Sequence, residues 1–565
     1  HPLFRGYLKK VCLEQDEGAA QALLLRAARW FAEHEYWLDA IRLGLESGHV
    51  EEVRGWINQC AMDLLEQGDF TTLVMLEKRW ELQEFNAPVQ LKMARAWAMG
   101  LALEVEAAQA LLAEAQSQME REGVQPSSLL YWETQALQAM LLGLADHNER
   151  SGVLAATCFE AVPHRPWVTN VLLNLMSCSH YHASRWDAFY TLPPSLLGSR
   201  QATNMLSHDC YRQSIHALAE SAQGRIDTAE ECLHALLARI ESIFSRSLNR
   251  PNPALLALPL ALLAQLAYLR GDRQLAESHL AQCMDFIAMG GFLDCMAAAY
   301  CTSARLQWRQ GFAPRARRTL EQLDGLATQR GWTRMRARVL LERTWLNLRD
   351  GKQREAMACG HYLIELAGEP ADDGSLDRQA YAQLATLWLA INGLDSSPGL
   401  IDACEALLLR LRDRQLQLMY AEVALALGML HCLQGSRERG EHLLDEVLVL
   451  VRDTKAISLL QDLPVADLCG MLEGRVSDQW WAGAEAWLQE NLMDDCAVTV
   501  CNAALLELTV KERQVMQLVA EGKSNKQIAR DLNVTPETIK SHMKSIFAKL
   551  KVDNRAQAAV MLQTG

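Results

Sequence analysis

Apolar and polar positions follow the period of an α-helix along most of the chain, in paired runs separated by a glycine. Three of these pairs read ALAESAQGRIDTAEECLHALL, LLAQLAYLRGDRQLAESHLAQCM and SARLQWRQGFAPRARRTLEQL. In each pair one helical run ends near a glycine with polar neighbours, and a second helical run follows. The pattern therefore predicts an all-α chain that is built from helical hairpins.

The glycines between the paired runs recur at steps of 47, 40, 40, 42 and 42 residues. They are Gly224, Gly271, Gly311, Gly351, Gly393 and Gly435. Glycine provides the left-handed conformation that ends a helix, and a small residue soon afterwards lets the second helix pack closely. After three of the glycines, an alanine follows at the fifth position and a leucine at the ninth. These residues are Ala229 and Leu233, Ala276 and Leu280, and Ala316 and Leu320.

One such hairpin cannot bury both of its apolar faces, so neighbouring hairpins must stack into a superhelix. The pattern is weaker at Gly48, Gly100 and Gly143, and Pro398 interrupts it after Gly393. We predict a tetratricopeptide-like solenoid over residues 21–485, with a period longer than the roughly 34 residues of an ordinary tetratricopeptide repeat. Such a solenoid serves either as a scaffold that holds proteins or as a sensor whose groove takes a ligand.

Most tryptophans stand in the apolar helix that precedes a repeat glycine, as Trp308 and Trp345 do. We expect them to pack in the core rather than to form a sugar-binding surface. Cys178, His180 and His182 alternate in SCSHYH, but the surrounding pattern is helical and no fourth ligand is evident, so we expect no zinc site.

Charge divides the chain into a large acidic body and a small basic end. The formal net charge is −14, yet residues 505–565 carry ten Lys and Arg against six Asp and Glu. This asymmetry is typical of a nucleic-acid-binding appendage. The fifteen cysteines are scattered without a CxxC pair, and no apolar run is long enough for a membrane span, so we expect reduced thiols and a cytoplasmic protein.

The basic end contains start and stop signals for three helices. Thr509 with Glu512 forms a capping box, and Gly522 ends the first helix. Ser524 caps the second helix and Thr535 caps the third. Gly522, Lys523 and Ser524 also spell the end of a phosphate-binding loop, but the required earlier glycine is Gln517 and no strand precedes it. The triplet is therefore expected to be a helix stop and a helix start.

Helices over 524–532 and 535–550, joined by a short turn, form a helix-turn-helix. The inner face of the first two helices is predicted to contain Val515, Leu518, Val519, Ile528, Ala529 and Leu532. The inner face of the third helix is predicted to contain Ile539, Met543, Ile546, Phe547 and Leu550. The opposite face of the third helix carries Lys540, Ser541, Lys544, Ala548 and Lys551 and is open to solvent or DNA.

The stretch LTVKERQVMQLVAEGKSNKQIARDLNVTPETIKSHMKSIFAKLKVDNRAQAA resembles the LuxR/GerE-type four-helix DNA-binding domain of LuxR-family transcription regulators. The matching elements are Leu508-Thr509, Glu512-Arg513, Gly522, Ser524-Asn525, Ile528-Ala529, Thr538-Ile539-Lys540, His542, Lys549-Leu550, Val552 and Asn554-Arg555. The resemblance implies that the third helix enters the major groove, with bases read by Lys540, Ser541 and Lys544. It also implies phosphate contacts from Asn525, Lys526, Thr535 and Thr538, and dimer contacts from residues 554–563.

The rest of the chain resembles the large MalT-like regulators of this family, and HPLFRGYL resembles the end of their winged-helix segment. The resemblance implies a nucleotide-binding module upstream of residue 1. Because this chain contains no phosphate-binding loop, we expect no ATPase activity and no cofactor here, with ATP bound only by that upstream module. The resemblance further implies an inducer or a regulatory protein in the solenoid groove, a dimer or oligomer on promoter DNA, and contact with RNA polymerase.

We therefore predict four parts: a winged-helix tail over 1–20, the solenoid sensor over 21–485, a linker over 486–504 that includes Asp494 and Asp495, and the helix-turn-helix over 505–565. The function predicted is a transcription regulator, an activator, controlled by a ligand. The alternatives are a protein-interaction scaffold and a signal-transduction ATPase whose upstream domain is the main actor. The ligand-binding residues and the inducer are not indicated by the sequence.

Overall fold

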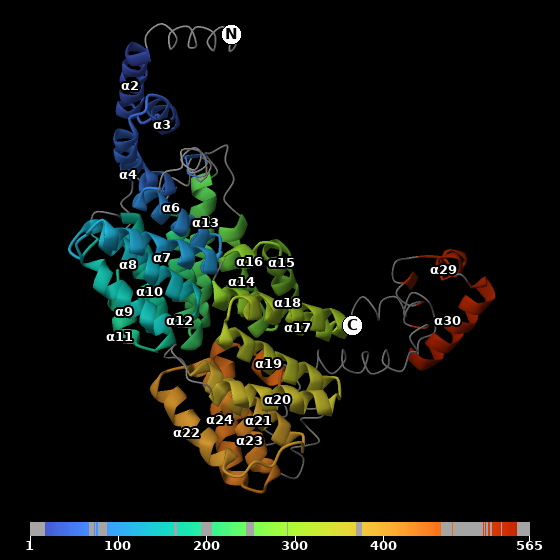
Figure 1. Cartoon of the computed structure of the whole chain (residues 1–565). Helices are drawn as coiled ribbons and strands as arrows, with labels where there is room; N and C mark the ends of the chain where they lie inside the picture. The colour runs from blue at the N-terminus through green and yellow to red at the C-terminus, as the bar shows by residue number, and fades with distance from the viewer. Residues whose placement is uncertain are drawn as a thin grey trace.

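The computed structural model describes residues 17–66, 73, 75–76, 87–162, 166–193, 206–244, 253–290, 292–368, 376–464, 477, 512, 515, 518–519, 523–532 and 534–550. Every regular element among these residues is a helix, which confirms the all-α prediction (Figure 1). The predicted winged-helix tail lies outside the described residues apart from 17–20, which belong to a helix, and the predicted linker over 486–504 lies wholly outside them. The predicted domain boundaries stay predictions.

The helices before the DNA-binding region form a superhelical stack of antiparallel pairs. The stack begins with α2 (Glu17–Glu33), α3 (Trp37–Glu46) and α4 (Val50–Glu66). Its pairs are α6 (Val89–Leu101) with α7 (Val105–Arg121), α8 (Leu129–Leu144) with α9 (Asn148–Phe159), α10 (Pro166–His182) with α11 (Trp186–Thr191), α12 (Leu206–Ala222) with α13 (Ile226–Phe244), α14 (Pro253–Leu269) with α15 (Arg273–Cys283), α17 (Leu293–Arg309) with α18 (Ala313–Gln329), α19 (Thr333–Arg349) with α20 (Gln353–Gly368), α21 (Asp377–Ile391) with α22 (Leu400–Asp413), and α23 (Gln417–Leu433) with α24 (Arg437–Thr454). Two short helices complete it, α16 (Ile287–Gly290) and α25 (Ser458–Gln461).

The repeat glycines end the first helix of their pairs, as predicted. All six have left-handed backbone, with φ between +68° and +89°. At Gly271, for example, the amide donates to the carbonyl of Tyr268 at 2.9 Å, and the amide of Asp272 donates to that of Ala267 at 2.9 Å. The alanines and leucines that follow them are buried, since Ala229, Ala276 and Ala316 are 0% exposed. The stacking pattern predicted from these positions is therefore confirmed.

Two upstream glycines do not end a helix, which corrects the weaker part of the repeat prediction. Gly100 and Gly143 lie inside α6 and α8, and the left-handed residues are Leu103 and Asp146, each with φ of 65°. A Cβ added to Gly100 would lie 2.5 Å from the Met140 side chain, on the next first helix of the stack. These glycines therefore allow close approach of helices instead of forming a turn.

The first helices of successive pairs line the inside of the superhelix, and we call α12, α14, α17, α19, α21 and α23 the inner helices. Each contacts the next along the series, and most side chains of α14 and α23 are buried. The second helices bury only one face; α13 and α24 are examples. Tryptophans pack here as expected: Trp345 is 1% exposed, and half-buried Trp308 meets it edge to face at 5.2 Å between ring centroids.

The superhelix closes on itself after about one turn. Trp186, at the start of α11, donates its Nε1 hydrogen to the carbonyl of Arg414, 228 residues later, at 2.7 Å. Helix α12 contacts α23 at the same seam. Similarly, Nε1 of Trp332 donates to the carbonyl of Leu144 at 2.7 Å, across 188 residues. These contacts bring repeats that are distant in sequence against one another.

A buried ionic cluster fixes the second of these contacts. The guanidinium of Arg334 on α19 is 4% exposed and lies 2.8 Å from Asp146, 2.7 Å from Asp294 and 3.2 Å from Asp377. His182, at the end of α10, lies 3.3 Å from Asp294 through Nε2. Burial and Arg334 lower the pKa of His182, but Asp294 outweighs both and the pKa rises to about 10. Loss of one partner from such a cluster costs about 3–5 kcal/mol.

The place of His182 also bears on the SCSHYH motif. Its residues lie on α10, which confirms the helical context, and the Cys178 thiol faces the Asn148 amide oxygen at 3.5 Å. No group of three metal-ligating side chains comes together in the described ranges. The cysteines placed by the structure are free thiols, most of them buried. Within the same ranges, no helix is both long and apolar enough to cross a bilayer.

The repeat glycines give a first test of the fold. We expect Gly271→Ala to lower the free energy of unfolding by about 1–2 kcal/mol, because an alanine is strained at φ +82° even though no atom lies within 4 Å of the new Cβ. Gly325→Ala is the matched control, since Gly325 lies exposed inside α18 without positive φ, and there alanine should stabilise by about 0.5–1 kcal/mol. Equal effects of the two substitutions in chemical denaturation would contradict the assignment of the turn.

His182 makes the stability of the stack depend on pH. Its folded pKa lies above the ordinary value near 6.5, so its contribution is complete below about pH 6.5 and is lost as the pH rises through about 10. We expect the free energy of unfolding of the wild type to fall more steeply between pH 7 and 10 than that of His182→Gln, by up to about 1.4 kcal/mol per pH unit. Parallel pH profiles for the two chains would show that His182 is not charged in the fold.

Candidate nucleic-acid interface

The C-terminal helix-turn-helix consists of α29 (Asn525–Asp531) and α30 (Pro536–Leu550), close to the predicted ranges. Ser524 caps α29: its hydroxyl accepts from the amide of Gln527 at 3.4 Å, and the Gln527 side chain accepts from the Ser524 amide at 2.8 Å. Thr535 caps α30 by accepting from the amide of Thr538 at 3.2 Å. These local bonds satisfy amides that the first turn of a helix leaves free. Ser524 therefore starts a helix, as the sequence predicted.

A small apolar core holds the two helices against a preceding helical segment. Its buried members are Val515, Val519, Ile528, Ala529, Ile539, Met543 and Ile546, with Leu518, Leu532 and Phe547 packed against them. The predicted inner face is thereby confirmed for every residue except Leu550, whose side chain lies outside the described residues. The amide of Val534 donates to the carbonyl of Ala529 at 2.9 Å and closes the short turn between the helices.

One polar contact in this domain was not predicted. Glu512 is 4% exposed, and its carboxylate accepts from the hydroxyl of Ser545 at 2.6 Å. The bond ties the first helical segment to α30 across 33 residues of sequence. The capping box predicted for Thr509 and Glu512 stays a prediction, because Thr509 lies outside the described residues. The helical period places Ser545 about 40° from the outward residue Ser541, so the sequence did not indicate this bond.

The face of α30 opposite the core presents the three side chains predicted to contact bases. Lys540, Ser541 and Lys544 are all exposed, and they occupy positions i, i+1 and i+4 of the helix. Ala548 and Lys551, predicted for the same face, lie outside the described residues. The structure therefore brings one hydroxyl and two ammonium groups together on a single solvent-facing strip.

Lys540 is partly neutralised in the chain without DNA. Its Nζ lies 3.1 Å and 3.2 Å from the two carboxylate oxygens of Glu537, three residues earlier. The two side chains are 62% and 79% exposed, so solvent screens the pair and it contributes little to stability. A stronger acceptor can therefore take Lys540 from Glu537 at low cost.

The residues predicted to contact phosphates cluster around the N-termini of the two helices. Thr535 and Thr538 are exposed at the start of α30, with their hydroxyl oxygens 2.8 Å apart. Asn525 is half-buried in the first turn of α29, and the Lys526 side chain lies outside the described residues. Because amides and the helix dipole make a helix N-terminus favourable for anions, this arrangement suits phosphate oxygens.

Comparison with known proteins places this end of the chain in a family. Residues 506–562 match the family described as bacterial regulatory proteins, luxR family. The HTH-type transcriptional regulator AlkS of Ectopseudomonas oleovorans is 52% identical over 59 residues, which are 10% of this chain and 7% of that protein. The monoamine regulon transcriptional regulator of Klebsiella aerogenes is 35% identical over 106 residues, which are 19% of this chain and 42% of that protein.

A third relative extends the same picture. The nitrate/nitrite response regulator protein NarL of Escherichia coli is 36% identical over 108 residues, 18% of this chain and 47% of that protein. The chain thus spans less than half the length of each of these relatives. For the helical stack, the solved structure of a Rap protein complexed with competence and sporulation factor matches 66% of this chain and 99% of that one. The TM-score is 0.45 and the sequence identity is 10%, so the two structures are only distantly alike. The family match, the cap geometry and the core agree that the C-terminal residues 506–562 form a helix-turn-helix domain of the luxR type.

Proposed function

We propose that the chain is a DNA-binding transcription regulator whose helical stack controls its C-terminal helix-turn-helix. The observation that carries the proposal is the exposed strip of Lys540, Ser541 and Lys544 on α30, opposite the apolar core of a luxR-type domain. An α-helix fits the major groove of B-DNA, and its exposed side chains then reach the base edges. The strip supplies hydrogen-bond donors for that role.

In this proposal the three residues read bases and the helix N-termini hold the backbone. A lysine ammonium donates to O6 and N7 of guanine, and a serine hydroxyl contacts any base. Thr535 and Thr538, with Asn525 and Lys526, contact phosphates and so orient the domain. Lys540 leaves Glu537 on binding, and Glu537 becomes free to accept from a cytosine amino group.

Control by the stack requires a ligand that binds one state better than another. A cleft of about 400 Å³ supports a small-molecule site at the seam where the superhelix closes. Gln223 and Gly224 line it from one side, and Tyr420, Glu446 and Arg412 from the other. A molecule in this cleft would contact both the turn after α12 and α23, where the superhelix closes on itself, and so would favour the closed form of the superhelix. The resemblance to MalT-like regulators extends the proposal to activation of transcription, a dimer on DNA and contact with RNA polymerase.

The base-reading strip can be tested on an operator selected from genomic fragments with the full chain. We expect Lys540→Ala and Lys544→Ala each to weaken operator binding by about 1–3 kcal/mol and to relax the preferred sequence. Titration of the labelled operator, and of operators with single base-pair changes, measures both effects at one fixed salt concentration. A scaffold whose tail does not read DNA would bind equally with and without the two substitutions.

Two control variants separate base reading from charge and from folding. Lys352→Ala removes the same charge from an exposed position in the stack and should leave operator binding unchanged. Ser545→Ala removes the bond to buried Glu512 and should destabilise the domain by about 1–3 kcal/mol without altering its sequence preference. An equal loss of binding in Lys352→Ala would mean that overall charge, not the α30 strip, determines affinity.

A further inference from the structure

The chain turns back into the superhelix directly after the last long helix. Helix α24 ends at Thr454, Lys455 takes a left-handed conformation with φ of 58°, and Ser458–Pro464 follows; we call these seven residues the docked segment. Its three leucines, Leu459, Leu460 and Leu463, are at most 6% exposed and belong to the main apolar core. Helix α25 within it contacts the inner helices α14 and α23.

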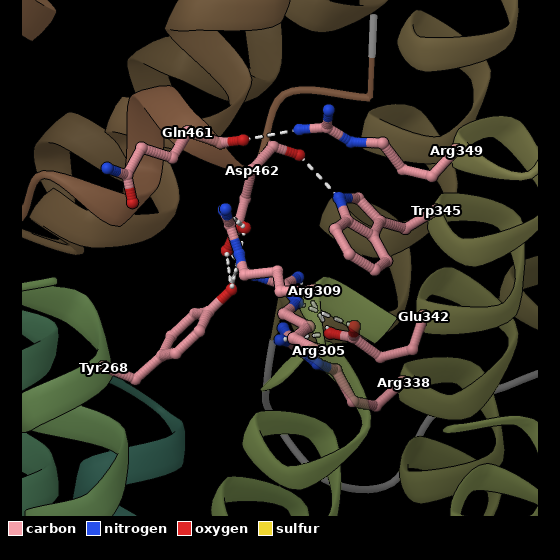
Figure 2. Close-up of polar contacts among 9 residues, drawn as sticks. All are labelled: Tyr268, Arg305, Arg309, Arg338, Glu342, Trp345, Arg349, Gln461 and Asp462. Carbon is pink, nitrogen blue, oxygen red and sulfur yellow. Dashed lines mark hydrogen bonds and ion pairs between the residues drawn. The ribbon is translucent and has the colours of Figure 1, made fainter. Parts of the chain in front are cut away.

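One carboxylate of the docked segment is held by three side chains of the inner helices (Figure 2). Asp462 is 7% exposed and accepts from Arg305 at 2.7 Å and from Arg309 at 2.7 Å. The hydroxyl of Tyr268 lies 2.8 Å and 3.1 Å from its two oxygens. Burial raises the pKa of Asp462, but the two arginines outweigh burial and hold that pKa below its ordinary value. The carboxylate is therefore charged at neutral pH.

Side chains from two further inner helices bind the backbone of the same segment. Trp345 donates Nε1 to the carbonyl of Asp462, and Arg349 donates to the carbonyl of Gln461. Asn392, at the end of α21, donates to the carbonyl of Pro464 at 3.1 Å. The inner helices therefore bind both main-chain carbonyls and one specific side chain of the segment, as a protein does when it recognises a peptide. Here the peptide is part of the same chain.

The surrounding charges require an anion at this place. Glu342 pairs with Arg305 at 2.8 Å and with Arg338 at 2.7 Å, so these guanidinium groups keep their orientation independently of the docked segment. Without Asp462, Arg305 would keep Glu342, but the carboxylate that Arg305 and Arg309 both contact at 2.7 Å would be lost. Uncompensated buried charge is costly, so the site selects a segment that brings a carboxylate.

We propose that the inner surface around Arg305, Arg309 and Trp345 is a docking site for an acidic peptide, and that its occupant, the docked segment, is a releasable connection between the stack and the DNA-binding domain. The segment lies between the last helix pair and residues 506–562, and further along the chain the hydroxyl of Ser477 donates to Glu441 on α24 at 3.0 Å. Release would free residues 458–464 from the inner helices. The regulatory half of this inference rests on the proposed function.

Hydrogen exchange of the full chain tests the docking. Tyr268→Phe removes one donor to Asp462 without a change in charge, and Asp462→Asn removes the charge. We expect both to speed exchange of the amides in Ser458–Pro464 by roughly 10-fold or more, while exchange in α14 and α17 is unchanged. Tyr300→Phe, on α17 and away from the segment, should change neither. Faster exchange that spreads equally over α14 and α17 would overturn the proposal, because the segment would then be an inseparable part of the core.

A peptide supplied in trans tests the chemistry of the site. Labelled ISLLQDLP, the sequence of residues 457–464, should bind the Asp462→Asn chain at least 10-fold more tightly than the wild type, whose site is filled. The same peptide with Asn in place of Asp should bind at least 10-fold more weakly, since it lacks the charge that the arginines need. Equal binding of the two peptides to the variant chain would refute a carboxylate-selective site.

Operator binding separates this inference from the proposed function. If Asp462→Asn speeds exchange in the docked segment and changes operator affinity by several-fold, the segment couples the two parts. If exchange speeds up and operator affinity stays the same, the segment docks on the inner helices but does not couple the stack to the DNA-binding domain. A wild-type chain that binds no operator while the exchange and peptide results hold would defeat the proposed function and leave the peptide site in place.

Discussion

Charges that lie on the most buried helices decide how this fold closes. Arg305, Arg309 and Arg334 are buried on α17 and α19, and each needs a carboxylate in the interior. Arg334 finds Asp146 from an early repeat, and the other two find Asp462 from the last segment of the stack. Because an unpaired buried charge is so costly, these pairings fix which distant repeats meet.

The same requirement explains why the docked segment lies against the inner helices. Leucines of the docked segment bury apolar area, and Trp345 and Asn392 satisfy its carbonyl groups. A buried backbone needs such partners, and side chains from the inner helices provide them. A cleft lies at the seam beside Gly224, where the turn after α12 faces α23 and α24.

The C-terminal domain is organised by shorter-range forces. Its core has few residues, its helix starts are fixed by Ser524 and Thr535, and a bond from Ser545 to Glu512 joins the first helical segment to α30. Local capping and a small core leave one face of α30 free of packing. That face carries the lysines, so the part of the chain with the clearest chemistry depends least on the rest of the fold.

The sequence by itself determined the hairpin repeat, the left-handed glycines, the helix caps and the two faces of α30. Each of these is set by residues within about one or two helical turns, where period and conformational preference act directly. It did not reveal that Gly100 and Gly143 serve close packing, that His182 joins an ionic cluster, or that Asp462 returns to the inner helices. Only the tertiary structure decided those contacts, because they join different helices, up to 194 positions apart in the sequence, and depend on how far each repeat rotates against the next.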